Sequence, residues 1–198
     1  MEDLDYYKPM RDNYVPGADL WVTESADAAC GGNTWAPTFV ETFRYVDELA
    51  RFGLNTRGVI FHNTLASSAY GLLDSETHQP RPQYWGGLLL AKLAGEKVYD
   101  THEPIREGVH LYAFSRKDGE EGVCYVLVNN SETETVQVEV PACVRYTLSS
   151  DKLRSQKIFL NGSELVMPDA YTMPALDGEA VAAGTVSVAP CTIAYIVV

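Results

Sequence analysis

A carboxylate followed by a glycine-containing loop is the part of the sequence best suited to chemistry. Residues 19–24 read as a short buried strand that ends on Glu24, and residues 25–33 form a loop of small residues with two adjacent glycines. A strand delivers its last side chain to the rim of a sheet, where loops gather to form sites. A carboxylate held there on rigid backbone suits a nucleophile for sugar chemistry. The alternative is a structural glutamate that caps the following helix or pairs with a lysine.

The elements that must position this carboxylate are two consecutive strand–helix units within residues 18–94. Apolar residues at spacings of three and four predict the helices, and Gly or Pro marks their ends. After the first strand, the predicted elements are a helix from the N-cap Thr34 to about Arg51 with Gly53 as its stop, a strand at 58–61, a loop at 65–81 and a helix from Pro82 to Gly95. The residues expected to be buried are Phe39, Phe43, Val46 and Ala50 in the first helix, and Tyr84, Trp85, Leu88, Leu89 and Leu93 in the second.

From residue 97 onward the apolar residues alternate with a period of two. Such alternation in short segments separated by turn residues is typical of an antiparallel β-sandwich. The predicted strands are 109–114 and 122–128 paired around 117–119, then 136–140, a hairpin of 158–160 with 164–167 around Asn161-Gly162, 185–188 and 192–198. The chain therefore divides near Gly95 into a strand–helix region, 1–95, and a β-sandwich domain, 96–198.

Two strand–helix units are too few to close a barrel, which needs eight strands to remove its edges. An open pair of parallel strands leaves unpaired backbone groups at its edges and one face of each helix bare. We therefore expect residues 1–95 to be the C-terminal part of a (β/α)8 TIM barrel, and the sequence to be the C-terminal part of a longer protein.

The charge balance of the chain excludes several classes of partner. With 15 basic and 27 acidic residues the formal net charge is −12, and no basic cluster stands out. Binding to nucleic acid or anionic lipid needs a positive face, so neither is expected. No apolar run reaches the length of a membrane span, and the acidic N-terminus is not that of a signal peptide.

Cysteines and sequons add little to the functional interpretation. Cys124 and Cys191 fall in predicted strands, where a cysteine behaves as a small buried hydrophobe. Two Asn-x-Ser sequons, at Asn129 and Asn161, matter only if the chain is secreted by a cell that glycosylates. No metal-site spacing connects the four cysteines, which are Cys30, Cys124, Cys143 and Cys191.

Several short motifs occur in a specific order along the chain. They are Leu-Trp-Val-Thr-Glu-Ser at 20–25, Cys-Gly-Gly at 30–32, Ala-Tyr-Gly-Leu-Leu-Asp at 69–74, Pro-Gln-Tyr-Trp at 82–85 with Leu-Leu at 88–89, Leu-Asn-Gly at 160–162 and Met-Pro at 173–174. One such motif would be weak. Together, their order and spacing resemble the heparanase and β-glucuronidase family of retaining glycoside hydrolases, family 79. The resemblance covers nearly the whole chain beyond its N-terminal segment.

The resemblance implies an eight-stranded barrel joined to a β-sandwich, with Glu24 ending the seventh barrel strand as the catalytic nucleophile. It implies hydrolysis of a β-linked glucuronide by double displacement, in which a second carboxyl roughly 5 Å away protonates the leaving oxygen and then activates water. It also implies that Tyr70 and backbone amides around Gly31 and Gly32 bind the sugar carboxylate. No metal or organic cofactor is implied, and secretion or a lysosomal or vacuolar location is expected from the resemblance only. Judged one at a time, Tyr70 as a core aromatic and the glycines as turn formers are the favoured interpretations.

The sequence departs from the family pattern at three places. His62 and Asn63 stand where family members usually have Arg-Gln or Gln; both could hydrogen-bond the nucleophile or a sugar hydroxyl, and a histidine satisfied within the protein is the alternative. Ala29 replaces a tyrosine common in the loop after the nucleophile. The family's acid/base is the Glu of an Asn-Glu pair, which occurs nowhere in the chain, and nothing assigns that role to Asp27 or Asp74. Without the proton donor, the 198 residues alone are not expected to turn over an unactivated glycoside.

Two other functions stay open beside the cleavage of a glucuronic-acid-containing saccharide. One is a non-catalytic carbohydrate-binding or interaction module, in which exposed aromatic residues on one sandwich face stack on sugar rings. Tyr112, Tyr125 and Tyr195 are the candidates, although their period-two placement favours core packing. The other is a related retaining glycosidase with a neutral sugar substrate.

Overall fold

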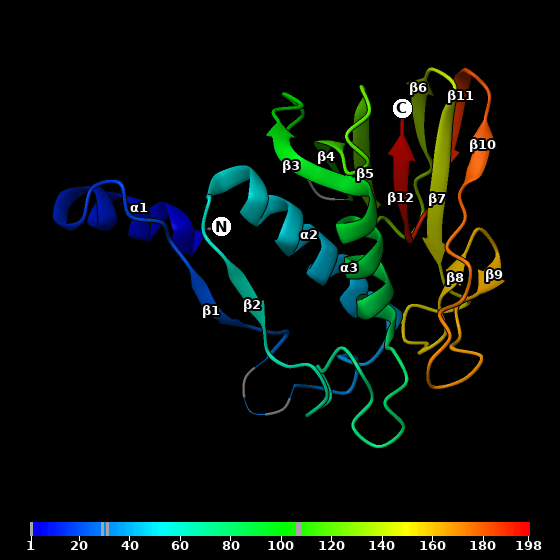
Figure 1. Cartoon of the computed structure of the whole chain (residues 1–198), viewed down its shortest axis with the longest axis horizontal. Coiled ribbons are helices and arrows are strands. Elements are labelled where there is room, and N and C mark those ends of the chain that lie inside the picture. Colours follow the sequence, from blue (N-terminus) through cyan, green and yellow to red (C-terminus); the bar gives the residue numbers. More distant parts are fainter. Residues whose placement is uncertain (1, 29, 31, 106–107) are drawn as a thin grey trace.

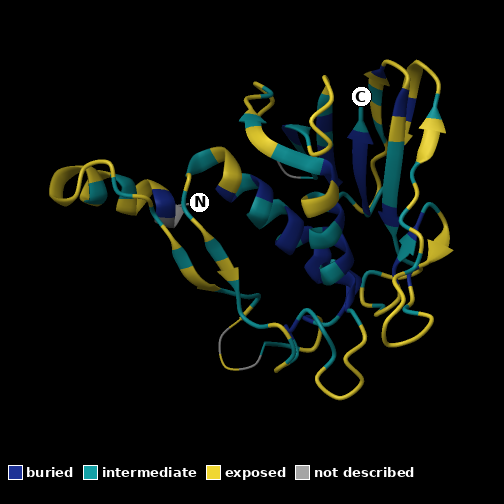
Figure 2. Ribbon diagram, in the orientation of Figure 1, coloured by how far each residue is buried: buried dark blue, intermediate teal, exposed yellow. Residues whose placement is uncertain are grey.

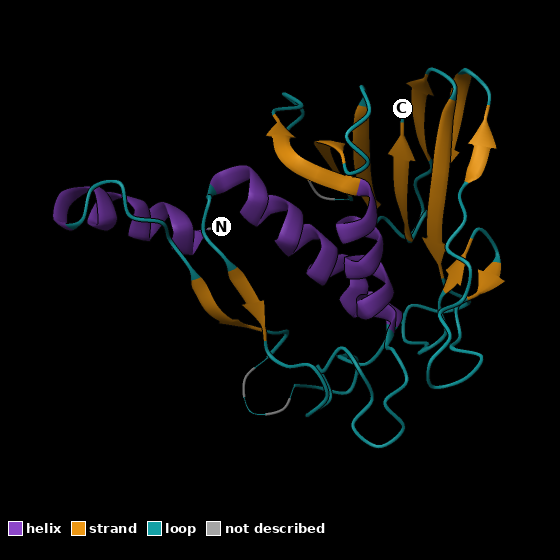
Figure 3. Cartoon of the chain, viewed as in Figure 1, coloured by secondary structure: helices purple, strands orange, loops and turns teal. Residues whose placement is uncertain are grey.

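The computed structural model describes residues 2–28, 30, 32–105 and 108–198, and Figure 1 shows how their elements are arranged. Helices α2 and α3 lie between a small parallel sheet and a large antiparallel sheet (Figure 3). The helices are α1 (Glu2–Tyr14), α2 (Phe39–Asn55) and α3 (Pro82–Leu93). The strands are β1 (Val22–Ser25), β2 (Ile60–His62), β3 (Ala94–Tyr99), β4 (Val109–Arg116), β5 (Val123–Asn129), β6 (Val136–Val140), β7 (Cys143–Ser149), β8 (Phe159–Leu160), β9 (Ser163–Glu164), β10 (Glu179–Val181), β11 (Gly184–Val188) and β12 (Thr192–Val197).

Strands β1 and β2 form the small parallel sheet, with Val22 opposite Ile60. The prediction of a buried strand that ends on Glu24 is wrong in two respects. The strand continues to Ser25, and one face of the sheet is open, since Trp21 is 59% exposed and Phe61 48% exposed. Their rings lie 6.1 Å apart on that face. Among the described residues, no third strand pairs with β1 or β2, so the outer edges of this small sheet are unpaired as well (Figure 2).

Helix α2 begins later than its sequence indicates. The prediction of a start after Thr34 is wrong, because residues 34–37 form turns and the helix starts at Phe39. Its N-cap, Thr38, makes no side-chain cap; instead, the N–H groups of Phe39 and Val40 donate to the carbonyl oxygens of Ser155 and Leu153, each at 2.8 Å. A distant loop therefore satisfies the orphan donors that a local cap would otherwise take. The helix also continues past Gly53, its predicted stop, to Asn55.

Helix α3 begins at Pro82 as predicted, with the proline in its first turn. It packs closely on α2 because Gly86 has no side chain: a Cβ there would lie 2.7 Å from Thr42 Cγ2 and 2.8 Å from Val46 Cγ2. The predicted stop at Gly95 is one strand too far, since the helix ends at Leu93 and Gly95 lies in β3. The predicted helical core residues are buried except Tyr84 and Leu88, which pack against the core while half-buried.

The large sheet has the strand order β3-β4-β5-β12-β7-β8-β9, and β10 pairs with β7. All its pairings are antiparallel, and the strand pair expected around 117–119 is confirmed. The hairpin around Asn161-Gly162 is confirmed at its turn but is shorter than predicted, since its second strand ends at Glu164 and not at residue 167. One face packs on α2 and α3, and the other packs on the separate antiparallel pair of β11 and β6. A second layer is thus present over part of the sheet, and a complete β-sandwich stays a prediction.

One hydrophobic core joins the helices to the large sheet. It contains Phe39 and Trp85 from the helices together with Tyr112 and Tyr195 from the strands, all nearly inaccessible to solvent. The Tyr195 hydroxyl donates to the carbonyl oxygen of Gly86 at 2.7 Å. The predicted division near residue 95 stays a prediction, but the core extends across that position.

The buried tyrosines correct one alternative from the sequence. Tyr112 and Tyr195 are not exposed on a sandwich face, so they cannot stack on a sugar ring; Tyr125 is half-buried against the second core. Among the residues that the structure describes, we find no helix with the length and apolar content that a membrane span requires.

The structure shows the positions of two cysteines, Cys124 and Cys191, and of Asn129 in the first sequon. Cys124 is buried in β5, and burial raises the pKa of its thiol to about 12. The placement of Cys191 in a strand is wrong, because it occupies a left-handed position (φ 51°) just before β12. Asn129 is fully buried, and its amide donates to the carbonyl oxygens of Glu134, Val188 and Ala189 at 2.8–3.2 Å.

Candidate active site

Three of the predicted site residues line one recess at the carboxyl ends of β1 and β2. The recess has a volume of about 300 Å³, and Glu24, Asn63 and Tyr70 reach it from three different segments. Glu24 comes from β1, Asn63 follows β2, and Tyr70 comes from the loop before α3. The carboxyl ends of parallel strands are where α/β folds place their sites. Among the described residues, the lining is Glu24, Ser25, Ala26, Ala28, Cys30, Asn63 and Tyr70.

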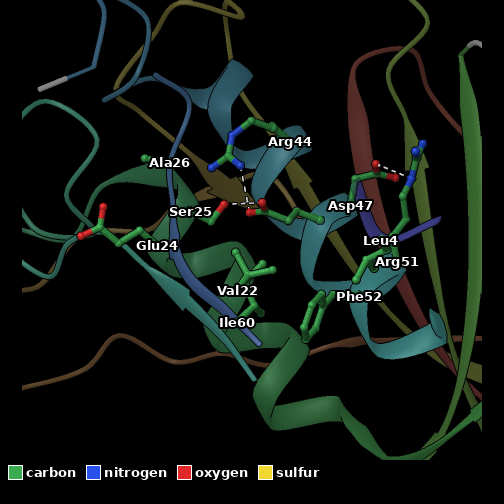
Figure 4. Close-up of a pocket in the computed structure, with 11 residues that line it drawn as sticks. Leu4, Val22, Glu24, Ser25, Ala26, Arg44, Asp47, Arg51, Phe52 and Ile60 are labelled. Carbon is green, nitrogen blue, oxygen red and sulfur yellow. Dashed lines mark hydrogen bonds and ion pairs between the residues drawn. The ribbon is translucent and has the colours of Figure 1, made fainter. Parts of the chain in front are cut away.

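Glu24 is exposed, and its neighbour Ser25 fixes the end of the strand. Figure 4 shows the Glu24 side chain turned away from α2, whereas Ser25 faces α2. The Ser25 hydroxyl donates to the carboxylate of Glu48, and the Ser25 carbonyl oxygen accepts from the N–H of Asn63 at 2.8 Å. The strand end is therefore held by the helix behind it and by the neighbouring chain, which leaves the Glu24 carboxylate free toward the recess.

The helix behind the strand presents charges at this point. Arg44 Nη1 lies 2.9 Å from Glu48 Oε2, and Arg44 Nη2 lies 2.5 Å from Glu41 Oε1. Burial raises the pKa of the Glu41 carboxyl, and the pairing with Arg44 only partly opposes that rise. These α2 residues border a second cavity, of about 480 Å³, between the small sheet and α2, which is lined in part by Arg44, Asp47, Glu48 and Arg51 (Figure 4).

Tyr70 and Gly32 pack against each other beside Glu24. Tyr70 is 7% exposed, and a Cβ on Gly32 would lie 2.8 Å from Tyr70 Cδ1, so only glycine allows the ring its position. Gly32 also has φ +84°, which favours glycine. None of the described residues forms a hydrogen bond with the Tyr70 hydroxyl, and Tyr70 is part of the lining of the recess. Gly31, the other predicted glycine, lies outside the described residues, as does Ala29.

His62 is placed differently from its neighbour Asn63. It is absent from the described lining of the recess; its Nε2 lies 2.8 Å from the carbonyl oxygen of Tyr70, and its ring packs 4.8 Å from the ring of Tyr45. Burial lowers the pKa of His62, so the neutral ring donates from Nε2 to the carbonyl. This is the alternative interpretation of His62, a histidine satisfied within the protein, and a direct contact with substrate stays a prediction.

Neither aspartate near the recess is placed as a proton donor. Asp74 accepts hydrogen bonds from the N–H and hydroxyl of Thr77 and from the N–H of Glu76, and it pairs with Arg81; these contacts hold its pKa far below the ordinary value, so it is ionised. Asp27 accepts from the Asn33 amide and does not line the recess. Within the described residues, no cluster of three or more His, Cys, Asp or Glu side chains is arranged to hold a metal ion.

The fold is similar to that of solved glycoside hydrolases. A solved arabinofuranosidase aligns with 100% of this chain and 47% of its own, with a TM-score of 0.71 and 14% identity. The GH30 endoxylanase of Clostridium papyrosolvens C71 aligns with 96% of this chain and 44% of its own, with a TM-score of 0.55 and 16% identity. At this identity the match concerns the fold alone. The structural neighbours are barrel enzymes, and the small parallel sheet with its helices is consistent with part of such a barrel.

Sequence relatives narrow the class to one family. Heparanase-like protein 1 of Arabidopsis thaliana is 30% identical over 144 residues, which are 72% of this chain and 26% of that protein. Baicalin-beta-D-glucuronidase of Scutellaria baicalensis is 27% identical over 81% of this chain, and mouse heparanase is 30% identical over 86%. No protein-family model matches the chain. The chain is thus related to heparanase and glycoside hydrolase family 79, as its motifs indicated.

Two facts about these relatives bear on function. The matched segments span only 26% to 36% of the lengths of the curated relatives. One relative, 24% identical over 93% of this chain, is the inactive heparanase-2 of Homo sapiens. Kinship with glycoside hydrolases is therefore established, whereas activity has to be argued from the residues of this chain.

Proposed function

We propose that this chain is the C-terminal part of a retaining glycoside hydrolase that cleaves β-glucuronides, with Glu24 as the nucleophile. The observation that carries the proposal is the convergence of Glu24, Tyr70 and Asn63 on one recess. Glu24 lies far from Asn63 and Tyr70 in the sequence, and each of the three would have a chemical role in the cleavage of a uronic acid glycoside. A structural glutamate would instead pair with a cation or cap a helix, and Glu24 does neither among the described residues.

The first step would be attack of the Glu24 carboxylate on the anomeric carbon. A bond forms between a carboxylate oxygen and that carbon, the bond to the leaving oxygen breaks, and the leaving oxygen takes a proton from an acid. Water then attacks the same carbon and releases Glu24, with the acid acting as a base. We assign the acid/base to a residue outside this chain, because Asp74 is ionised and Asp27 does not line the recess.

Recognition of the uronic acid would rest on neutral donors. Tyr70 lines the recess and packs against Gly32, and a tyrosine hydroxyl together with backbone amides can bind a carboxylate without a cation. Asn63 would hydrogen-bond a sugar hydroxyl. The substrate class is therefore a saccharide or glycoside with a terminal or internal β-glucuronic acid unit.

The role of Glu24 as nucleophile can be tested in this chain with a substrate whose leaving group needs no proton from an acid. 2,4-Dinitrophenyl β-glucuronide releases dinitrophenolate as an anion, so Glu24 alone can form the glycosyl-enzyme. We expect a burst of dinitrophenolate with one equivalent of glucuronyl adduct, located on the peptide with Glu24 by mass spectrometry. Glu24→Gln should abolish both. Glu76→Gln, which changes an exposed carboxylate outside the recess, is the matched control and should keep them. An adduct that persists in Glu24→Gln contradicts the proposal.

The substrate class is tested with the matching dinitrophenyl β-glucoside. Tyr70→Phe removes only the hydroxyl, so it should slow the burst with the glucuronide and spare the burst with the glucoside. Equal effects on both substrates would favour a neutral sugar instead. The two experiments thus separate the reaction from its specificity.

A further inference from the structure

The loop that carries Tyr70 is held from behind by one buried guanidinium. Arg81 Nη1 donates to the carbonyl oxygens of Ser68 at 2.8 Å, Ala69 at 2.6 Å and Gly71 at 3.2 Å. Its backbone N–H donates to the carbonyl oxygen of Leu72 at 2.9 Å. A single residue therefore binds four of the five consecutive carbonyl oxygens in residues 68–72.

The remaining carbonyl, that of Tyr70 itself, is held by two other side chains. His62 Nε2 lies 2.8 Å from it, and Gln83 Nε2 donates to it at 3.4 Å and to Gly71 at 3.1 Å. Gln83 is fully buried. The backbone of Tyr70 thus has donors on its own carbonyl and on those of both its neighbours, although the loop belongs to no helix or sheet.

Arg81 is costly to bury, and the structure provides it with a counter-charge. It is 8% exposed, and its Nη2 lies 3.2 Å from Asp74 Oδ2. A guanidinium is a flat, rigid fork with several donors, so it can bind several carbonyls at once. Here Nη1 makes all three side-chain contacts to the carbonyls and Nη2 faces Asp74, and a lysine, with one nitrogen, cannot occupy both positions at once. Without the guanidinium, the Ala69 carbonyl would have no donor among the described residues, which is unfavourable, and the carbonyls of Ser68 and Gly71 would each lose one of two donors.

We propose that Arg81 is a positioning residue for recognition of the sugar carboxylate. It fixes the backbone on both sides of Tyr70, so that the Tyr70 ring stays against Gly32 and Tyr70 keeps its place in the recess that Glu24 also lines. Arg81 itself does not line that recess. The inference rests on the proposed function, since it assigns Arg81 a part in reading a uronic acid.

The test measures burst rate constants with dinitrophenyl β-glucuronide and dinitrophenyl β-glucoside on the 198-residue chain. Arg81→Lys should lower the ratio of the glucuronide to the glucoside rate constant by about tenfold, the loss expected for a misplaced hydrogen bond to a charged group. Tyr70→Phe should lower the ratio by a similar factor. The double variant should fall no further than either single variant, because Arg81 acts through Tyr70.

A matched variant separates positioning from loss of stability. Arg51 is a half-buried guanidinium bound to Asp47 and Tyr112 between α2 and β4. Arg51→Lys should lower the melting temperature without changing the rate ratio. If Arg81→Lys does not fold by circular dichroism, Asp74→Asn replaces it: this change loosens the guanidinium and keeps the carbonyl contacts, so a smaller fall in the same ratio is expected.

The outcomes distinguish this inference from the proposed function. If Tyr70→Phe leaves the ratio of the glucuronide to the glucoside rate constant unchanged, Tyr70 does not recognise the sugar carboxylate, and the proposed substrate class is wrong. A fall in Tyr70→Phe with an unchanged ratio in Arg81→Lys, or in Asp74→Asn where that variant is used, overturns the positioning role alone. Additive effects in the double variant also overturn it, because they mean that Arg81 acts independently of Tyr70.

Discussion

The two sides of the α2–α3 layer are built in opposite ways. On one side, the helices share a continuous apolar core with the large sheet, and the side chains at its centre are almost inaccessible. On the other side, the small parallel sheet faces charged α2 residues across a cavity of about 480 Å³, and its far face is open. Figure 2 shows the contrast, with buried segments in α2, α3 and the large sheet and exposed ones in β1 and β2.

This difference indicates that the large sheet with its helices stabilises the fold, whereas the side with the small sheet carries the candidate site. Burial of apolar area is the dominant source of stability, so the large sheet and the helices should carry most of the free energy of unfolding. The candidate site sits on the weakly covered side, where Glu24 is held through Ser25 and Glu48 and Tyr70 is held through Arg81. Polar contacts there set positions and contribute little area.

The largest expected effect comes from removing the side chain at the centre of the core. Trp85 is 1% exposed and contacts both helices and the sheet, so Trp85→Ala should lower the free energy of unfolding by about 3–5 kcal/mol. Chemical denaturation followed by circular dichroism measures it. A loss below about 1 kcal/mol would mean that the core we describe does not carry the stability.

The next effect concerns a charged network in the seam between α2 and β4. Asp47 lies 2.5 Å from both His110 Nδ1 and the Tyr112 hydroxyl, and 2.8 Å from Arg51 Nε. Burial alone would raise the pKa of Asp47, but the hydrogen bonds from His110 and Tyr112 and the charge of Arg51 outweigh it and lower that pKa below 3.8. Asp47→Asn should therefore cost about 1–3 kcal/mol at neutral pH.

The same network gives a pH dependence with a defined sign. Because the folded-state pKa of Asp47 lies below 3.8, the unfolded chain binds the proton more readily. The stability that Asp47 contributes is present above that pH and is lost as the pH falls through the folded-state pKa. The difference in unfolding free energy between the unchanged chain and Asp47→Asn should shrink over that acidic range. A constant difference would rule out this coupling.

Two glycines on facing helices should respond with opposite signs. Gly86→Ala places a Cβ within 2.7–2.8 Å of two stiff methyl groups of α2, so it should cost about 1–3 kcal/mol. Gly53→Ala is the matched control inside α2, where a Cβ would make only ordinary contacts at 3.8 Å or more. It should stabilise the chain by up to about 1 kcal/mol. Stabilisation by both changes in thermal denaturation would show that helix propensity, rather than helix packing, governs both positions.

Elements with a local signal were predictable from the sequence. The β4–β5 hairpin, the Asn161-Gly162 turn and the start of α3 at Pro82 each follow from turn or cap chemistry within a few residues. The start of α2 was not predictable, because its donors are satisfied by residues 153 and 155. The exposure of one face of β1 was not predicted for a similar reason. The sequence of an apolar strand does not show whether another element packs on it.

The residues of the candidate site also differ in whether a local sequence signal predicted them. Glu24 and Tyr70 stand in motifs that a single sequence shows, and both reach the recess. Arg81 went unnoticed, because its partners are backbone carbonyls, which carry no residue identity. The one local signal was an arginine directly before the proline that starts a helix, a position where a buried charge is unusual. The loop fold that brings residues 68–72 around it has no periodicity to predict.

The smallest expected effect probes the open face of the small sheet. Phe61 is about half exposed and touches Trp21, so Phe61→Ser removes little buried area and should change the free energy of unfolding by no more than about 0.5 kcal/mol. The same change should raise solubility, because Trp21 and Phe61 form an exposed apolar pair on a sheet with unpaired edges. Denaturation and the concentration at which the chain aggregates measure the two. A loss of several kcal/mol would mean that this face is covered in solution, and the contrast between the two sides of the helices would then be false.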